Sequence, residues 1–405
     1  MNIYLARQPI FTRNRQVHAY ELLFRGGMEN CFPRIDGDTA TSRVLSNAFF
    51  TTGLDQITSG KRAFINFPKK LLADGIPLMF PPELTTIEIL ENTEVDDRLI
   101  ALCRDLVSKG YTLALDDFAY SPSLDPLIDL SHIIKIDFLA SHPDEASECV
   151  RRFSCQGRKM LAEKVETEHD FETACRMGFT YFQGYFFSKP EVIRDTEIPA
   201  LKMNLIRIMS EARRDEYDVK KLEHLIEKDV GISYKLLRYL NSPFFRRRIP
   251  ISSIRQAIVM LGEKGIRSFL SVIILAELSQ DKPDELIRSS IIMARMCERF
   301  GAETRSGLDT SELFMLGLFS HIDAILDNTM ENVLERLPLA PEIKQALLHG
   351  NGPLARYLDL ARHYQQGQWD RVSDAASRIG LDEDKIPGIY LDALGYADAL
   401  YATTE

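Results

Sequence analysis

Two patterns of hydrophobic and polar positions divide the chain. Up to about residue 190, short β-branched and aromatic runs are separated by longer stretches with a helical period. The runs that predict strands are residues 64–67, 86–90, 111–117, 133–137, 159–163 and 181–187. Because strands separated by helical crossovers pair in parallel, this half predicts an α/β fold. Six or more such units can close into a TIM-like (β/α) barrel, although about 190 residues is short for eight full repeats.

The second half follows a helical period almost throughout. A polar stretch at residues 191–197 separates it from the first half and resembles a linker. Beyond it, apolar residues recur three and four positions apart, as at Leu236, Leu237 and Leu240. We therefore predict two domains, an α/β barrel over residues 1–195 and an all-helical domain over residues 196–405.

Composition narrows the class of protein. The 405 residues include 49 Lys and Arg against 59 Asp and Glu, and 45% are hydrophobic, which is typical of a globular protein and not of a disordered chain. The longest apolar stretch, residues 269–278, is far shorter than the ~20 residues of a membrane span. The six cysteines show neither metal-ligand nor redox spacing. We expect a soluble, cytoplasmic protein with reduced thiols and no membrane contact.

The acidic balance also weakens a general attraction to nucleic acid. One basic run, residues 246–248, follows Phe244 and Phe245, and aromatic rings beside cations are typical of a phosphate or nucleic-acid contact. The same run fits a solvated loop after a helix. In a chain with a formal net charge of −10 the second interpretation is favoured, and nucleic acid is not the expected partner.

Polar residues recur near the carboxyl ends of the predicted strands. They are Asn66, Glu88, Asp116, Asp117, Lys135, Asp137, Glu163 and Gln183. In a parallel barrel these ends meet at one rim, where the catalytic residues of such barrels lie. Carboxylates gathered there repel one another unless cations neutralise them, and hard oxygen ligands favour Mg²⁺ or Mn²⁺ over zinc. Each residue alone also fits a capped or solvated strand end, but their recurrence on successive strands predicts a two-metal site for phosphodiester cleavage.

Seven sequence blocks, in the same order, resemble the EAL domain of cyclic di-GMP phosphodiesterases. They are Gln8–Ile10, Tyr20–Arg25, Glu88–Glu91, Asp116–Phe118, Lys135–Asp137, Ala162–Thr167 and Gln183–Pro190. The resemblance implies a (β/α) barrel that binds cyclic di-GMP and hydrolyses it to the linear dinucleotide. It also implies a homodimer formed through this domain.

The resemblance further implies a role for each matched residue. The ligands of two Mg²⁺ or Mn²⁺ ions would be Glu21, Asn66, Glu88, Asp116 and Asp117, with Asp116 bridging the two ions. The catalytic residues would be Lys135, which orients the attacking water, and Glu163, which helps to activate it. The substrate-binding residues would be Arg25, which holds a phosphate, together with Gln183 and Gln8. Glu91 would support the neighbouring loop.

Several positions depart from the family pattern. Leu22 adds bulk beside Glu21, and Lys164 replaces a glycine after Glu163. The loop after Asp117 lacks the family's glycines and contains a proline, which narrows its backbone conformations. Because an error of about 1 Å in an active site costs on the order of 100-fold in rate, two functions stay open. The domain is either a phosphodiesterase or an inactive relative that acts as a nucleotide sensor or protein scaffold.

The helical half resembles an HDOD domain, best over residues 199–330. The similar segments are residues 225–230, 236–242 and 253–262. In the related HD hydrolases a His-Asp pair binds metal, whereas Ser320 and His321 stand at that place here. His321 and Asp323 are two residues apart and do not share a helical face. The resemblance implies a regulatory domain that binds a protein partner, without catalysis of its own.

Overall fold

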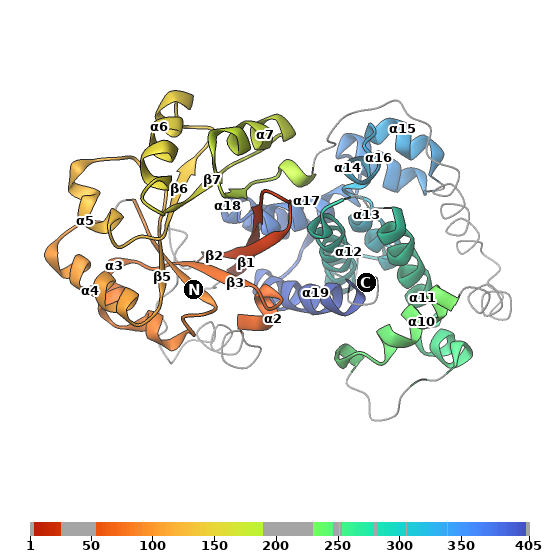
Figure 1. The fold of residues 1–405 in the computed structure, drawn as a ribbon. Helices are drawn as coiled ribbons and strands as arrows, with labels where there is room; N and C mark the ends of the chain where they lie inside the picture. The colour runs from red at the N-terminus through yellow and green to blue at the C-terminus, as the bar shows by residue number, and fades with distance from the viewer. Residues whose placement is uncertain are drawn as a thin grey trace. The chain divides into compact units, whose positions relative to one another are not determined.

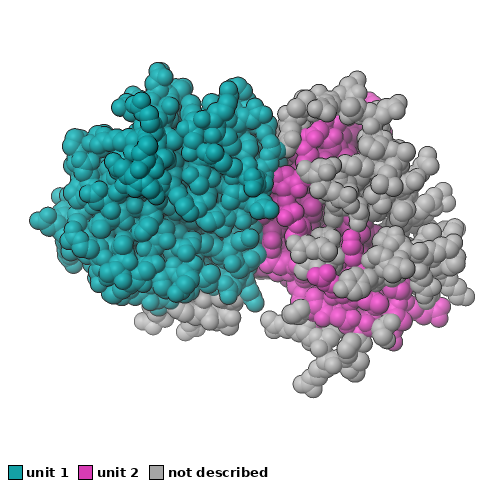
Figure 2. Space-filling model, in the orientation of Figure 1, with its two compact units in different colours: residues 1–189, 365–369 teal, residues 190–364, 370–405 magenta. Residues whose placement is uncertain are grey.

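The structure, a computed structural model, describes residues 4–25, 54–91, 93–188, 230–245, 251, 253–278, 282–304, 306–337 and 339–401. The chain forms two compact units, residues 1–189 with 365–369 and residues 190–364 with 370–405 (Figure 2). The predicted domain boundary at residues 195 and 196 lies outside the described residues and stays a prediction. The basic run at residues 246–248 also lies outside them.

The first unit is a closed barrel of eight strands that follow one another in chain order (Figure 1). The strands are β1 (Tyr4–Thr12), β2 (Val17–Arg25), β3 (Arg62–Asn66), β4 (Thr85–Ile89), β5 (Thr112–Leu115), β6 (Ile133–Asp137), β7 (Lys159–Glu163) and β8 (Tyr181–Gln183). The six predicted strands overlap β3 to β8. The prediction of an α/β barrel is therefore confirmed.

The strand β1 differs from the others because it runs antiparallel to both of its neighbours, β2 and β8. A tight turn joins β1 to β2, in which Arg15 N–H donates to the Thr12 carbonyl at 2.9 Å. Such a hairpin needs only a few residues, whereas a crossover between parallel strands needs a dozen or more. The hairpin explains how eight strands fit within so short a chain. The six predicted strands, β3 to β8, pair in parallel as expected, and β1 was not among them.

Helices follow the parallel strands and lie outside them (Figure 1). They are α2 (Leu54–Thr58), α3 (Lys69–Ala73), α4 (Asp97–Ser108), α5 (Asp125–Ile128), α6 (Pro143–Ser154) and α7 (Glu168–Met177). In α4, Leu99, Cys103 and Leu106 recur at helical spacing and are buried, as an amphipathic helix against a sheet requires. The residue before the helix, Asp96, caps its first turn, because its side chain accepts the Leu99 N–H at 2.8 Å.

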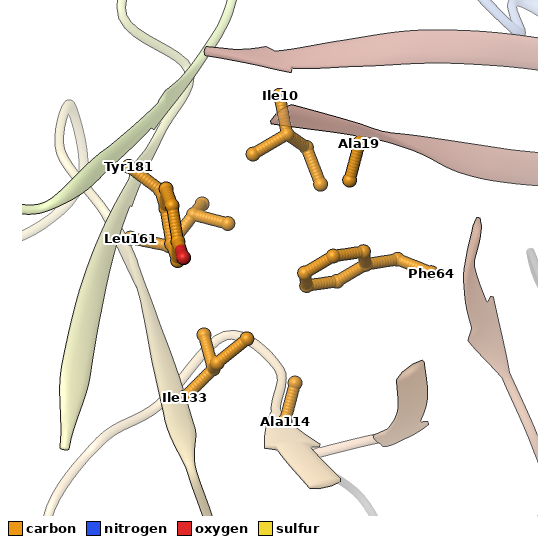
Figure 3. Packing of buried hydrophobic residues seen from close by; sticks show 7 residues of the cluster. All are labelled: Ile10, Ala19, Phe64, Ala114, Ile133, Leu161 and Tyr181. Atoms are coloured by element: carbon orange, nitrogen blue, oxygen red, sulfur yellow. The ribbon is translucent and has the colours of Figure 1, made fainter. Parts of the chain in front are cut away.

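A ring of apolar side chains fills the middle of the barrel (Figure 3). Its members are Ile10, Ala19, Phe64, Ala114, Ile133, Leu161 and Tyr181, and each is at most 5% exposed. Because side chains alternate along a strand, residues two positions from a ring member also face the interior. On the parallel strands, the residue two positions after a ring member lies at the carboxyl end of the barrel. The residue two positions before it lies at the amino end. Strand β3 shows all three layers, as Arg62, Phe64 and Asn66.

The second unit is helical wherever the structure describes it, as predicted. Its helices are α10 (Val230–Leu240), α11 (Ile254–Leu278), α12 (Asp284–Thr304), α13 (Thr310–Leu318), α14 (Ile322–Leu326), α15 (Met330–Arg336), α16 (Pro341–His349), α17 (Ala355–Gln365), α18 (Trp369–Ile379) and α19 (Ile386–Tyr401). Gly317 lets α13 approach the α12 backbone, because a Cβ there would lie 2.4 Å from the Met293 carbonyl oxygen. Within the described residues, each helix is too short or too polar to cross a membrane.

Candidate active site

Four carboxylates surround one lysine at the carboxyl end of the barrel, three of them on β2, β4 and β7 and the fourth directly after β5. Lys135 Nζ lies 2.6 Å from Asp116 Oδ1, 2.7 Å from Glu88 Oε1, 3.0 Å from Glu163 Oε1 and 3.2 Å from Glu21 Oε2. The side chains of Lys135 and Glu88 are fully buried, and the Asp116 side chain is 15% exposed. These five residues, which we call the carboxylate cluster, are all predicted site residues.

Amide side chains hold one carboxylate of the cluster in place. Asn66 Nδ2 donates to Glu21 Oε1 at 3.2 Å, and Gln183 Nε2 donates to Glu21 Oε2 at 2.7 Å. Gln183 Nε2 also lies 3.0 Å from Gln8 Oε1, which links β8 to β1 across the barrel seam. The structure therefore brings Asn66, Gln183 and Gln8 to the same end as the carboxylate cluster.

The charges of the carboxylate cluster are not balanced. Burial disfavours the Lys135 ammonium, but the surrounding carboxylates outweigh that cost and hold the pKa of Lys135 well above its usual value. Burial raises the pKa of Glu163 to about 8. Burial and the neighbouring Glu21 charge raise the pKa of Glu88 well above its usual value. One ammonium is too little positive charge for four carboxylates, so protons are retained instead.

The donor atoms fit a hard divalent cation. Within the described residues, Asn66 Oδ1, Glu88 Oε2 and Glu163 Oε2 are buried and have no hydrogen-bond partner. Buried oxygens of this kind are costly unless a proton or a cation reaches them, and carboxylate and amide oxygens suit Mg²⁺ or Mn²⁺. Among the described side chains, however, no group of three His, Cys, Asp or Glu residues is arranged around a metal position. The common point of the carboxylates is taken by Lys135 Nζ.

Asp117, the predicted second-metal ligand, lies beside the cluster and pairs with a different lysine. Its carboxylate is 4.0 Å from Lys164 Nζ, and Lys164 binds Asp137 Oδ2 at 2.5 Å. Both Asp117 and Lys164 have positive φ angles, 40° and 55°, which cost energy for residues other than glycine. Burial, and then the charge of Asp116, raise the pKa of Asp117. Lys164 therefore combines a positive φ with a side chain that lies between two carboxylates.

The remaining predicted residues are Glu91 and Arg25. Glu91 is exposed after β4 and lines, with Asp116 and Asp117, a cavity of about 260 Å³. Arg25 ends β2, and its side chain lies outside what the structure describes. Sequence reasoning did not foresee the ion pair of Asp137 with Lys164. The signal for it is the loss of the glycine after Glu163, which places a cation next to the predicted site.

A glycine after β8 fixes the approach of the backbone to the site. Gly184 has φ of 151°, and a Cβ at this position would lie 2.0 Å from the Val165 carbonyl oxygen. Only glycine permits this contact, since the clash is with backbone atoms. The contact holds the strand that carries Gln183 against the loop that follows Glu163.

In the helical unit, the residues that replace an HD pair form a buried polar contact. His321 Nδ1 lies 3.2 Å from Ser320 Oγ and 3.5 Å from Ser290 Oγ. Burial, and then the charge of Arg362, lower the pKa of His321 to about 4. A neutral histidine between two hydroxyls agrees with a structural role for this residue.

Comparisons with known proteins bear on both units. A family model of the EAL domain matches residues 66–190, and one of the HDOD domain matches residues 198–342. The chain is 39% identical to the cyclic di-GMP phosphodiesterase CdgJ of Vibrio cholerae over 386 residues, which cover 95% of this chain and 89% of that protein. It is 36% identical to the uncharacterized protein YuxH of Bacillus subtilis over 99% of both chains. An EAL domain protein from Listeria monocytogenes aligns with 46% of this chain and 87% of its own at 24% identity, with a TM-score of 0.37. Both predicted family resemblances are confirmed.

Proposed function

The chain belongs to the family of its relative CdgJ and joins an EAL domain to an HDOD domain, and on this premise we propose that its barrel binds cyclic di-GMP and hydrolyses it to the linear dinucleotide. The observation that carries the proposal is the carboxylate cluster around Lys135. A cation-deficient set of buried oxygens at the carboxyl end of a barrel is what a metal-dependent phosphodiesterase needs.

The proposed ligands of a first Mg²⁺ or Mn²⁺ ion are Glu21, Asn66, Glu88 and Asp116. A second ion would be held by Asp116 and Asp117. When bound, the two ions would stabilise the oxygens that enter and leave the phosphorus centre. The raised pKa values of Glu88 and Glu163 agree with this assignment, because burial, and then the neighbouring carboxylates, disfavour their charged forms, and a divalent cation would favour those forms.

The other residues would position the reactants. Lys135 would orient the attacking water by donating hydrogen bonds, since its ammonium is fully buried and points at the carboxylates that would share the site. Glu163 would accept a proton from that water once cations lower its pKa toward the ordinary range. Gln183 and Gln8 would bind the substrate from the seam between β8 and β1. Arg25 would hold a phosphate, and Glu91 would support the loop that carries Asp117.

We assign the helical unit an output role. It would bind a protein partner in response to the state of the barrel, and its buried His321 would contribute to packing and not to catalysis. A homodimer formed through the EAL domain, with cyclic di-GMP as the small-molecule ligand, completes the proposal.

One observation favours a second candidate, a barrel that senses cyclic di-GMP without cleaving it. Asp117 pairs with Lys164 and stands apart from the carboxylate cluster, and both residues have positive φ angles. A second metal ion would have to compete with the Lys164 ammonium for Asp117. In this alternative the first-metal ligands would still help to bind the nucleotide, and turnover would be absent.

Hydrolysis and binding, measured on the same sample, separate the two candidates. The full chain is incubated with cyclic di-GMP and Mn²⁺ while the linear product is followed by chromatography, and affinity is measured by calorimetry. We expect turnover that falls by at least about 100-fold in Glu21→Ala. Glu172→Gln, an exposed carboxylate on α7, is the matched control and keeps full activity. Tight binding without turnover contradicts the enzyme and supports the sensor, and the absence of binding contradicts both.

A further inference from the structure

A second cavity lies at the opposite end of the barrel from the carboxylate cluster. Its volume is about 550 Å³, and it is lined by the first residues of several strands. Arg62 begins β3, Lys159 begins β7, and Thr86 and Thr112 lie at the starts of β4 and β5. We call the cavity that these four residues line the amino-end pocket. The apolar ring of Figure 3 supplies Ile133 and Tyr181 to its floor.

The amino-end pocket carries positive charge that the protein does not neutralise. Within the described residues, neither Arg62 nor Lys159 has a carboxylate partner. Arg62 Nη1 lies 2.9 Å from Thr112 Oγ1, and Lys159 Nζ donates to the Tyr181 hydroxyl at 3.0 Å. Arg158, at the rim, is paired with Asp129 at 3.3 Å. In the part of the chain that the structure describes, the hydrogen bonds of Arg62 and Lys159 go to hydroxyls and a carbonyl, and the one carboxylate among the lining residues, Asp129, is paired with Arg158.

A buried hydroxyl in the same cavity also lacks a partner. Thr86 is fully buried, and its Oγ1 makes no hydrogen bond within the described residues. A buried hydroxyl without a hydrogen-bond partner costs free energy. A ligand atom in the cavity would supply the missing partner. The hydroxyl is free to donate to an anionic oxygen, and Arg62 and Lys159 supply the opposite charge.

The two histidines at the cavity add no charge of their own at neutral pH. His18 is stacked on Tyr181 with ring centroids 4.3 Å apart. Burial, and then the charges of Lys159 and Arg62, lower the pKa of His18 to about 4, and burial with the charge of Arg158 lowers that of His132. Both imidazoles offer neutral hydrogen-bonding groups beside the cations.

We propose that the amino-end pocket binds a small phosphate-bearing metabolite. A guanidinium, an ammonium and a free hydroxyl together match the several acceptor oxygens of a phosphate group better than a single carboxylate. The cavity volume lies within the ~300–1,000 Å³ of small-molecule sites and exceeds what inorganic phosphate alone would fill. An organic phosphate ester is therefore the ligand class. The proposal does not depend on hydrolysis at the other end of the barrel.

The test uses the full chain with EDTA present, so that divalent metal cannot bring phosphate to the carboxylate cluster. Ribose 5-phosphate, inorganic phosphate and ribose are titrated separately by calorimetry. We expect saturable binding of ribose 5-phosphate with a Kd below about 1 mM, weaker binding of inorganic phosphate and none of ribose. Equal binding of the two phosphates contradicts an organic phosphate ester as the ligand class. No saturable binding of either phosphate overturns the proposal.

Two variants and one control tie the binding to this cavity. Lys159→Met removes an exposed ammonium, and Thr86→Val replaces the unpartnered hydroxyl by a methyl group of the same size, so both are expected to fold. Lys159→Met should weaken binding by about tenfold or more, and Thr86→Val by about threefold or more. Lys264→Met removes an exposed lysine of the helical unit that is paired with Asp309, and binding should not change. If both pocket variants unfold like the wild type and bind phosphate with wild-type affinity, the phosphate binds outside this cavity. That result overturns the proposal.

Discussion

The two ends of the barrel are built on the same strands and carry opposite charge. The inward-facing residues of strand β7 are Lys159, Leu161 and Glu163, and those of strand β3 are Arg62, Phe64 and Asn66. In each, an apolar residue of the ring lies between a cation at the amino end and an oxygen ligand at the carboxyl end. On β3 and β7, the alternation of side chains thus places one apolar residue between the two polar sites.

The ends differ most in how deeply their charges are buried. Lys135 is fully buried among four carboxylates, whereas Lys159 is exposed and bound to one hydroxyl. Buried charges depend strongly on their partners, while exposed charges are screened by water. Substitutions at the carboxyl end should therefore change stability, and those at the amino end should change ligand binding alone.

The largest effect is expected for Lys135→Met. Among the described residues, Lys135 supplies the only ammonium within reach of these four carboxylates, so its removal should lower the free energy of unfolding by about 3–5 kcal/mol. Lys159→Met is the matched variant at the other end and should cost less than about 1 kcal/mol. Urea denaturation measures both. Equal losses of unfolding free energy in the two variants would contradict the claim that the charges at the two ends differ in burial.

The next effect concerns the pH dependence that Glu163 introduces. Its pKa in the folded protein is about 8, above its usual value, so the folded state holds the proton more tightly than the unfolded state. Its contribution to stability is therefore complete at low pH and is lost as the pH rises through about 8. Glu163→Gln keeps an acceptor for Lys135 and removes the titration.

Relative to wild type, Glu163→Gln should gain on the order of 2 kcal/mol between pH 5 and pH 8, measured by urea denaturation without metal. Glu172→Gln, exposed on α7, serves as the control and should show no such gain. A gain for Glu163→Gln that is the same at both pH values would contradict the buried, proton-retaining carboxylate.

The smallest stability change is expected for Lys164→Gly. Glycine relieves the positive φ of 55°, worth about 1 kcal/mol, but it also removes the ion pair with Asp137 and loosens the unfolded chain. The net change should stay within about 1 kcal/mol. Since Asp117 is released from Lys164, turnover of cyclic di-GMP with Mn²⁺ should rise, and a fall would show that Lys164 supports the site.

Much of this arrangement is readable from the sequence. The β-branched and aromatic runs at residues 64–67, 111–117 and 159–163 predict β3, β5 and β7. The polar residues near their carboxyl ends include Asp116 and Glu163 of the carboxylate cluster. Parallel strands carry their carboxyl ends to one rim whatever the details of the helices, which is why residues far apart in sequence could be grouped.

Other features depend on contacts that periodicity does not encode. The antiparallel β1 arises from a four-residue turn, and the central place of Lys135 Nζ depends on which long side chain reaches the common point. Arg62 and Lys159 look like ordinary solvated residues at strand starts. Their sequence signal is the alternation of side chains along a strand. Arg62 and Lys159 lie two positions before Phe64 and Leu161 and therefore face the interior at the amino end.

The central claim is that the carboxylate cluster binds a divalent cation. Equilibrium binding of Mn²⁺ to the full chain, followed by electron paramagnetic resonance of the free ion, tests this most directly, with Glu88→Gln as the variant and Glu172→Gln as the control. We predict saturable binding in the wild type and the control, and at least about tenfold weaker binding in Glu88→Gln. Equal Mn²⁺ binding in all three proteins, or none in the wild type, would contradict the account.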